Sequence, residues 1–144
     1  MSEWALVTGA GSGIGLEISR ALFQRGARVL GVALRQPELD DLAREARARG
    51  ATVSTRAIDL TEPGAVDRLL ASADERGIEI TTLVNCAGMG LYGEHLALDD
   101  AAVQRMVALN VSALTELSTK VARRMLARGA GRILNVASTA AFQP

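Results

Sequence analysis

Four glycines near the N-terminus form the segment of this chain that most clearly predicts chemistry. They occupy alternate positions of the loop Thr8-Gly9-Ala10-Gly11-Ser12-Gly13-Ile14-Gly15, between the apolar run at residues 4–7 and a helical pattern. Glycine tolerates positive φ and lets another group approach the backbone closely. A helix N-terminus adds unpaired N–H groups and a partial positive charge. The loop therefore predicts a seat for the phosphates of a dinucleotide.

The spacing of these glycines differs from that of better-known phosphate loops. It reads Gly9-x-x-x-Gly13-x-Gly15, with Gly11 as an additional glycine. A P-loop needs a lysine followed by serine or threonine after its last glycine, whereas Leu16 and Glu17 follow here. A glycine-rich turn that binds no ligand is the alternative interpretation.

Residues about 20 positions beyond the loop bear on which dinucleotide would bind. An NAD site usually has an acid at the end of the second strand, where it holds the ribose 2′-hydroxyl. Ala33 stands there instead, no repelling carboxylate is expected, and Arg35 is close enough to meet a 2′-phosphate. We therefore expect NADP(H) to be favoured over NAD(H), with a solvated Arg35 as the alternative.

Regular elements must hold these residues at one edge of a sheet. The expected strands are mostly apolar rather than alternating, which predicts parallel strands buried on both faces. Right-handed crossovers then give an α/β, doubly wound, Rossmann-type sheet of order 3-2-1-4-5. The strands are expected at residues 4–7, 28–33, 52–58, 80–85 and 132–137, and the helices at 13–25, 37–49, 61–76 and 99–129. Thr61 and Asp99 are expected to cap the last two helices.

Composition narrows the classes of protein to which the chain can belong. Its 144 residues are 49% hydrophobic and 3% aromatic, and 16 basic residues balance 16 acidic ones. This balance predicts no nucleic-acid partner, and no apolar run is long enough for a membrane span. A single cysteine and the lack of a signal-peptide pattern favour a cytoplasmic location. We expect one domain over residues 1–144 and no metal site.

Three further segments follow expected strands, at the edge where open α/β sheets bind their ligands. They are Asp59-Leu60, Asn85-Cys86-Ala87-Gly88 and the segment 131–138. Together with the glycine loop, and in this order, they closely resemble the short-chain dehydrogenase/reductase family over essentially the whole chain. The resemblance implies NAD(P)(H)-dependent hydride transfer between a nicotinamide and a small carbonyl or alcohol substrate.

The same resemblance implies which residues would contact the cofactor. The residues expected to line the pyrophosphate are Gly9, Ser12, Gly13, Ile14 and Gly15. The adenine would be contacted by Asp59 and Leu60, and the central ribose would lie beside Asn85, Ala87 and Gly88. A capping turn that begins at Asp59 is the alternative for that residue.

Two residues match positions in the family's catalytic machinery. Asn110 matches the helix asparagine that holds a water of the proton relay, and Ser138 matches the serine that hydrogen-bonds the substrate oxygen. A polar helix position and a plain strand-end hydroxyl are their alternatives. Cys86 replaces a second asparagine and is interpreted as a small buried side chain, because a Cys86–His95 nucleophilic pair has no evident orienting acid.

The family's Tyr-x-x-x-Lys pair has no counterpart in this sequence. The only tyrosine, Tyr92, has Leu96 rather than lysine four residues later. We therefore expect the cofactor-binding half of a longer enzyme, without the family's C-terminal strands and inactive by itself. The alternative is a non-catalytic nucleotide-binding module. A homo-oligomer that forms through the helical region 99–128 is also expected, because helices of this family pack across a subunit interface.

Overall fold

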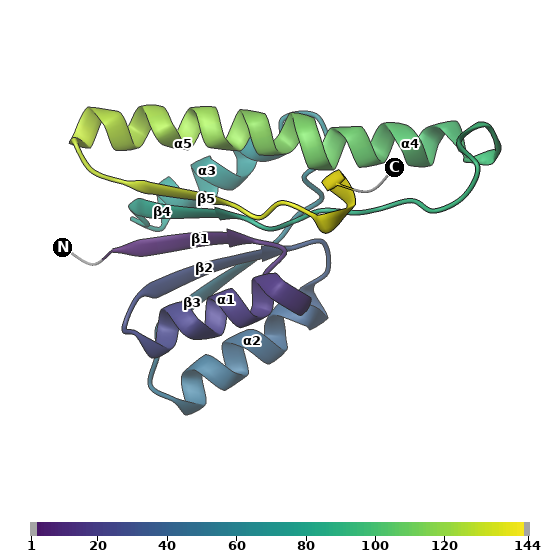
Figure 1. Cartoon of the computed structure of the whole chain (residues 1–144). Coiled ribbons are helices and arrows are strands. Elements are labelled where there is room, and N and C mark those ends of the chain that lie inside the picture. Colours follow the sequence, from purple (N-terminus) through teal and green to yellow (C-terminus); the bar gives the residue numbers. More distant parts are fainter. Residues whose placement is uncertain (1–2, 143–144) are drawn as a thin grey trace.

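The structure is a computed structural model that describes residues 3–142, so residues 1–2 and 143–144 of the expected domain lie outside it. Its centre is a five-stranded parallel sheet in the order β3-β2-β1-β4-β5 (Figure 1), which confirms the predicted Rossmann-type topology. The strands are β1 (Trp4–Thr8), β2 (Arg28–Ala33), β3 (Val53–Ala57), β4 (Ile80–Asn85) and β5 (Arg132–Asn135).

Helices cover both faces of this sheet (Figure 1). One face carries α1 (Gly13–Gln24) and α2 (Gln36–Ala48). The other carries α3 (Ala65–Glu75) and a long helical run made of α4 (Asp100–Val107), the π-helical segment η2 (Ala108–Ala113) and α5 (Leu114–Arg128). Two short 3₁₀ turns, η1 (His95–Ala97) and η3 (Thr139–Phe142), complete the described elements. Within residues 3–142, no helix has the length and apolar character needed to cross a bilayer.

Each face of the sheet contributes to a separate apolar core. Leu6 and Leu30 pack toward α3 and α5, whereas Val7 and Val29 pack toward α1 and α2, and all four are fully buried. Successive side chains of a strand point to opposite faces, so a strand covered on both sides must be apolar at every position. This explains why the sequences of β1 and β2, which are buried almost throughout, do not alternate.

Three details of the expected elements are wrong. Strand β5 ends at Asn135 rather than at residue 137. The helical region 99–129 begins at its Asp99 cap as predicted, but six of its residues form a π helix. Thr61 does not cap α3, because the helix begins only at Ala65, with Gly64 at its N-cap position. Thr61 instead belongs to an Asx turn, in which its N–H and hydroxyl both donate to Asp59.

The long helical run carries a stripe of apolar side chains, spaced three to four residues apart, that lies in two environments. Its C-terminal members Leu117, Val121 and Met125 are buried against the sheet. Its N-terminal members Val107 and Val111 are 43% and 56% exposed. The run therefore covers the core with one half and leaves apolar side chains in solvent with the other.

A hydroxyl joins the two central strands at their carboxyl ends. Thr8, at the end of β1, is 2% exposed, and its Oγ1 accepts hydrogen bonds from the backbone N–H groups of Cys86 and Ala87, each at 3.0 Å. These two groups follow β4, so one side chain holds the start of the glycine loop against the next turn of the site. Buried backbone donors that lose such an acceptor are costly to leave unpaired.

We expect Thr8→Val to lower the free energy of unfolding by about 1–3 kcal/mol, because it leaves two partly buried N–H groups without their acceptor. Thr8→Ser keeps the oxygen and should cost about 1 kcal/mol through the lost methyl group. Urea unfolding measures both. Equal losses in the two variants would show that the hydroxyl is not what joins the strands.

Asp59 generates a prediction about pH. The Thr61 hydroxyl, helped by the Thr61 N–H and the Arg105 guanidinium, lowers the pKa of Asp59 against the opposing effect of partial burial. A carboxyl with a depressed folded-state pKa stabilises the fold above its unfolded pKa and loses that contribution as pH falls through the folded value. Asp59→Asn should therefore be less stable than the parent by about 1 kcal/mol near neutral pH. The difference should shrink below about pH 4.

The matched control for this experiment is Asp41→Asn. Asp41 also pairs with an arginine, Arg44, at 2.6 Å, but both side chains are 73% exposed. An exposed pair contributes little, so this variant should follow the parent at every pH. A constant gap between the parent and Asp59→Asn down to pH 2 would contradict the assignment.

Candidate functional site

The glycine loop lies directly against the turn that follows β4. Gly9 has φ +69°, and a Cβ placed on it would come within 3.0 Å of the Ala87 N and Cα atoms. Only a residue without a side chain allows this approach. The structure therefore brings together Gly9 and Ala87, which the sequence placed in separate motifs.

The mouth of the loop opens at the N-terminus of α1. A Cβ on Gly15 would overlap the Gly9 carbonyl, which keeps the loop closed on itself, whereas a Cβ on Gly13 (φ +51°) would meet nothing within 4 Å. Ser12 is the N-cap of α1 and makes no side-chain cap hydrogen bond. The first N–H groups of a helix have no partner within the helix. The loop thus offers an open cradle with donors and positive potential, which fits a pyrophosphate.

The end of β2 carries a charged pair that the sequence analysis missed. Ala33 is buried, and Arg35 directs its Nε and Nη2 to Oε1 of Glu38, at 2.9 and 2.5 Å. The expectation that no carboxylate lies near this strand end is therefore wrong. Glu38 belongs to the first turn of α2, and this turn places its carboxylate next to the end of β2. The i,i+3 spacing of Arg35 and Glu38 was the available signal.

The residues after β3 form a turn whose carboxylate is already engaged. Asp59 Oδ1 accepts from the Thr61 N–H and hydroxyl, and Oδ2 accepts from Arg105 of α4 at 3.1 Å. Leu60 packs against the core that lies between the sheet and α3. Arg105 gave no sequence signal, because 46 residues separate it from Asp59.

Asn85 connects the end of β4 to two neighbouring elements. It is 3% exposed, and its Nδ2 donates to Ser118 Oγ of α5 and to Asn135 Oδ1 of β5, both at 2.8 Å. Both amide hydrogens are thus used within the protein. Ser118 and Asn135 are site-supporting residues that the sequence analysis did not identify.

The cysteine beside Asn85 lacks the character of a nucleophile. Burial raises the pKa of the Cys86 thiol, so the side chain stays neutral at ordinary pH. Cys86 packs among partly buried apolar side chains on the α1 and α2 side of the sheet. Cys86 is thus a small packing side chain, but it is only partly buried rather than buried as the sequence predicted.

Asn110 fixes the π-helical segment to the chain after β4. Its Nδ2 donates to the Met89 carbonyl at 2.7 Å, and its Oδ1 accepts from the Met89 N–H at 3.0 Å. The same Oδ1 would lie 3.4 Å from a Cβ on Gly88. Both halves of the amide therefore bind one backbone residue, and π segments of this kind often occur at functional sites.

Ser138 lies beyond β5 and is exposed. Its Oγ accepts from the Ala140 N–H at 3.1 Å, and this turn leads into η3. The hydroxyl proton can still donate to another acceptor, since accepting one bond leaves the O–H free. Apart from Asn110, which lies in the π-helical segment, these candidate residues follow the carboxyl ends of parallel strands, which is the edge where open α/β sheets bind ligands.

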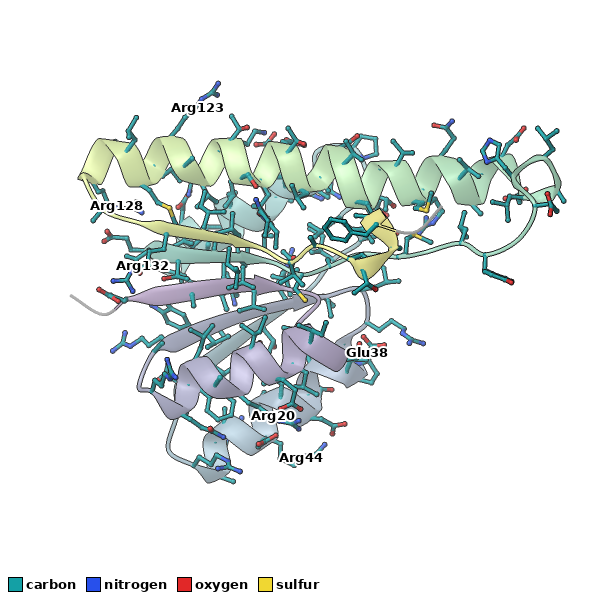
Figure 2. All side chains as sticks on the ribbon, viewed as in Figure 1. Arg20, Glu38, Arg44, Arg123, Arg128 and Arg132 are labelled. Atoms are coloured by element: carbon teal, nitrogen blue, oxygen red, sulfur yellow. The ribbon has the colours of Figure 1, made fainter. Side chains whose placement is uncertain are left out.

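A hollow at the opposite end of the sheet does not share this chemistry. It has a volume of about 390 Å³ and lies at the start of β4, beside the last turns of α3 and α5. Its charges are already paired, Arg124 with Asp74 and Arg128 with Glu79. Figure 2 shows Arg128 at this end and Glu38 at the other, where the glycine loop lies.

Comparisons with known proteins agree with this geometry. The family model described as short chain dehydrogenase matches residues 3–144. Galactitol 2-dehydrogenase (L-tagatose-forming) from Cereibacter sphaeroides is 41% identical over 135 residues, which make up 93% of this chain and 52% of that protein. The chain thus spans about half the length of this curated relative.

Solved structures give the same result. A metagenomic short-chain oxidoreductase in complex with NADP matches with a TM-score of 0.93 and 32% identity, over 100% of this chain and 66% of that one. L-sorbose reductase from Gluconobacter frateurii, complexed with NADPH and L-sorbose, matches with a TM-score of 0.90 and 33% identity, over 99% and 55%. Because the family model matches nearly the whole of this chain, the chain belongs to the short-chain dehydrogenase family.

Proposed function

We propose that this chain forms the dinucleotide-binding part of an NAD(P)(H)-dependent oxidoreductase. The observation that carries the proposal is the open cradle above Gly13 at the N-terminus of α1, closed at its base by Gly9 and Gly15. The cofactor would supply hydride transfer to or from a carbonyl or alcohol carbon. The dehydrogenase and reductase names of the relatives support this reaction class.

NADP(H) is the favoured cofactor in this proposal. Ala33 offers no acid to a ribose 2′-hydroxyl, and Arg35 carries a guanidinium that suits a 2′-phosphate. Two structural relatives hold NADP or NADPH, which supports the same choice. The pairing of Arg35 with Glu38 means that part of its charge is already offset.

The remaining site residues would bind and orient rather than react. Asp59 and Leu60 would flank the adenine, while Asn85, Ala87 and Gly88 would shape the wall beside the central ribose. Asn110 fixes the turn at Met89 with its side chain, and a water would be held at the site that this turn shapes. Ser138 would donate its free O–H to the substrate oxygen. The exposed hydroxyl of Ser138 supports the last role.

We propose further that the chain binds nucleotide without turnover. The single lysine, Lys120, bonds to Asp67 and Glu116, and the single tyrosine, Tyr92, is fully exposed. Neither can supply the paired Tyr-x-x-x-Lys of the family at this site. A non-catalytic nucleotide-binding module is the alternative, and an assay with generic ketones and NADPH tests for turnover.

A homo-oligomer is proposed on the side of the long helical run. Val107 and Val111 lie one helical turn apart and expose their side chains, and Leu126 is 84% exposed. Apolar side chains that share an exposed face favour contact with another surface. We also propose a cytoplasmic location, because the single cysteine suits a reducing compartment.

The sharpest test of nucleotide binding is Ser12→Asp. Aspartate is a favourable N-cap and interacts well with the helix dipole, so the variant should be as stable as the parent or more stable by about 0.5 kcal/mol. Its carboxylate would repel a pyrophosphate in the cradle, so NADPH affinity should fall by more than about ten-fold. Fluorescence titration and thermal unfolding measure the two effects.

Gln24→Glu is the charge-matched control for this test. Gln24 ends the same helix, far from the glycine loop, so the added charge should leave NADPH affinity within about two-fold of the parent. Unchanged binding by Ser12→Asp, or no binding by the parent, would remove the proposed function.

Arg35→Ala tests the cofactor preference. Loss of the guanidinium should weaken NADPH binding by about ten-fold and leave NADH binding nearly unchanged, because NADH has no 2′-phosphate. Arg44→Ala is the control, since Arg44 also pairs at i,i+3 spacing and is equally exposed, but lies within α2 rather than directly after β2. Equal effects of Arg35→Ala on the two nucleotides would contradict the preference for NADP(H).

A further inference from the structure

Glu38 is a charged group at the proposed nucleotide site to which the proposed function gives no role. It lies in the first turn of α2, and a Cβ on Gly11 would come within 2.6 Å of the Glu38 Cβ and 2.9 Å of its Oε2. The same position is 3.3 Å from the Ala33 Cβ. Glu38 therefore packs across the glycine loop and the end of β2 together.

The two oxygens of Glu38 have different surroundings. Oε1 accepts both hydrogen bonds from Arg35, and no hydrogen bond among residues 3–142 involves Oε2, which lies beside Gly11. The Glu38 side chain is 30% exposed, whereas that of Arg35 is 73% exposed. One carboxylate oxygen is thus engaged with the cation, while the other remains available beside the loop.

Glu38 brings a carboxylate close to the strand end at which a dinucleotide site of this fold usually has an acid. Such an acid follows the second strand and accepts from the ribose 2′-hydroxyl. Ala33 has no carboxylate to offer at the strand end, but Glu38 of the following helix places its own carboxylate nearby. A carboxylate at this place also repels a 2′-phosphate.

We propose that Glu38 is a specificity-determining residue, which opposes Arg35 by accepting from a ribose 2′-hydroxyl and repelling a 2′-phosphate. This inference rests on the proposed dinucleotide function. The nucleotide preference then depends on a balance between two neighbouring opposite charges, so the chain discriminates between NADPH and NADH less than Arg35 alone would allow.

The simpler explanation is that Glu38, like other acids near it, only forms an ion pair that stabilises the helix. Asp41 and Arg44 form such a pair on the same helix at the same i,i+3 spacing, with both side chains exposed to solvent. Glu38 differs from Asp41 in its contact with Gly11 and in its lower exposure. Asp41→Asn therefore removes an equivalent charge and an equivalent pair without touching the glycine loop.

The experiment measures the affinities of the folded chain for NADPH and NADH by calorimetry. Glu38→Gln keeps the shape of the side chain and removes its charge. We expect it to shift the ratio of the two affinities by roughly five-fold toward NADPH, with tighter NADPH binding and weaker NADH binding. Asp41→Asn should shift the ratio by less than about two-fold.

The double variant Arg35→Ala/Glu38→Gln separates direct repulsion from release of Arg35. If Glu38 acts on the nucleotide itself, the double variant should bind NADPH several-fold more tightly than Arg35→Ala alone. Thermal unfolding of each variant without nucleotide checks that the fold is retained.

Two results would overturn the inference. Weaker NADPH binding by Glu38→Gln would mean that Glu38 serves only to orient Arg35, and an unchanged ratio would mean that it acts only as a helix acid. A failure of the proposed function looks different, because the parent chain would then bind neither nucleotide and Ser12→Asp would change nothing.

Discussion

The close contact between the glycine loop and the turn after β4 is the constraint on which the rest of the site depends. Gly9 has no room for a side chain beside Ala87, and the buried Thr8 hydroxyl accepts both N–H groups that begin this turn. If the two central strands separated here, the cradle would lose its base. The space above Gly13 is open, and the hydrogen bonds that hold the base of the loop are made within the protein.

Beyond this contact, hydrogen bonds from polar side chains connect the neighbouring elements of the site. Asn85 uses both amide hydrogens to fix β5 and α5, and Asn110 uses both ends of its amide to fix Met89. Buried amides of this kind stabilise one arrangement only when every group is paired. Among residues 3–142, no buried side-chain oxygen or nitrogen lacks a partner. The protein thus keeps its site edge ordered before any ligand is considered.

The topology was predictable because it follows from local patterns. The central strands β1 and β2 are mostly apolar runs, Asp99 caps its helix as expected, and the glycine spacing marks the loop. The pairings within the site were not predictable, because they join residues distant in sequence, as with Asn85 and Ser118. Glu38 lay only three residues from Arg35, but its contact with Gly11 depends on how α2 packs against the loop. Thr61 was expected to cap α3 because threonine suits N-cap positions, but the helix begins four residues later and Thr61 serves the turn at Asp59 instead.

The π-helical segment at Ala108–Ala113 has a consequence for the phase of the helix that contains it. One residue inserted into an α-helix turns everything beyond it by about 100°. That turn separates the exposed face at Val107 and Val111 from the buried face at Leu117 and Val121. A one-residue deletion here would restore a regular helix and rotate the buried face off the sheet. The π-helical segment therefore helps to determine which side chains of the run reach the core and which remain in solvent.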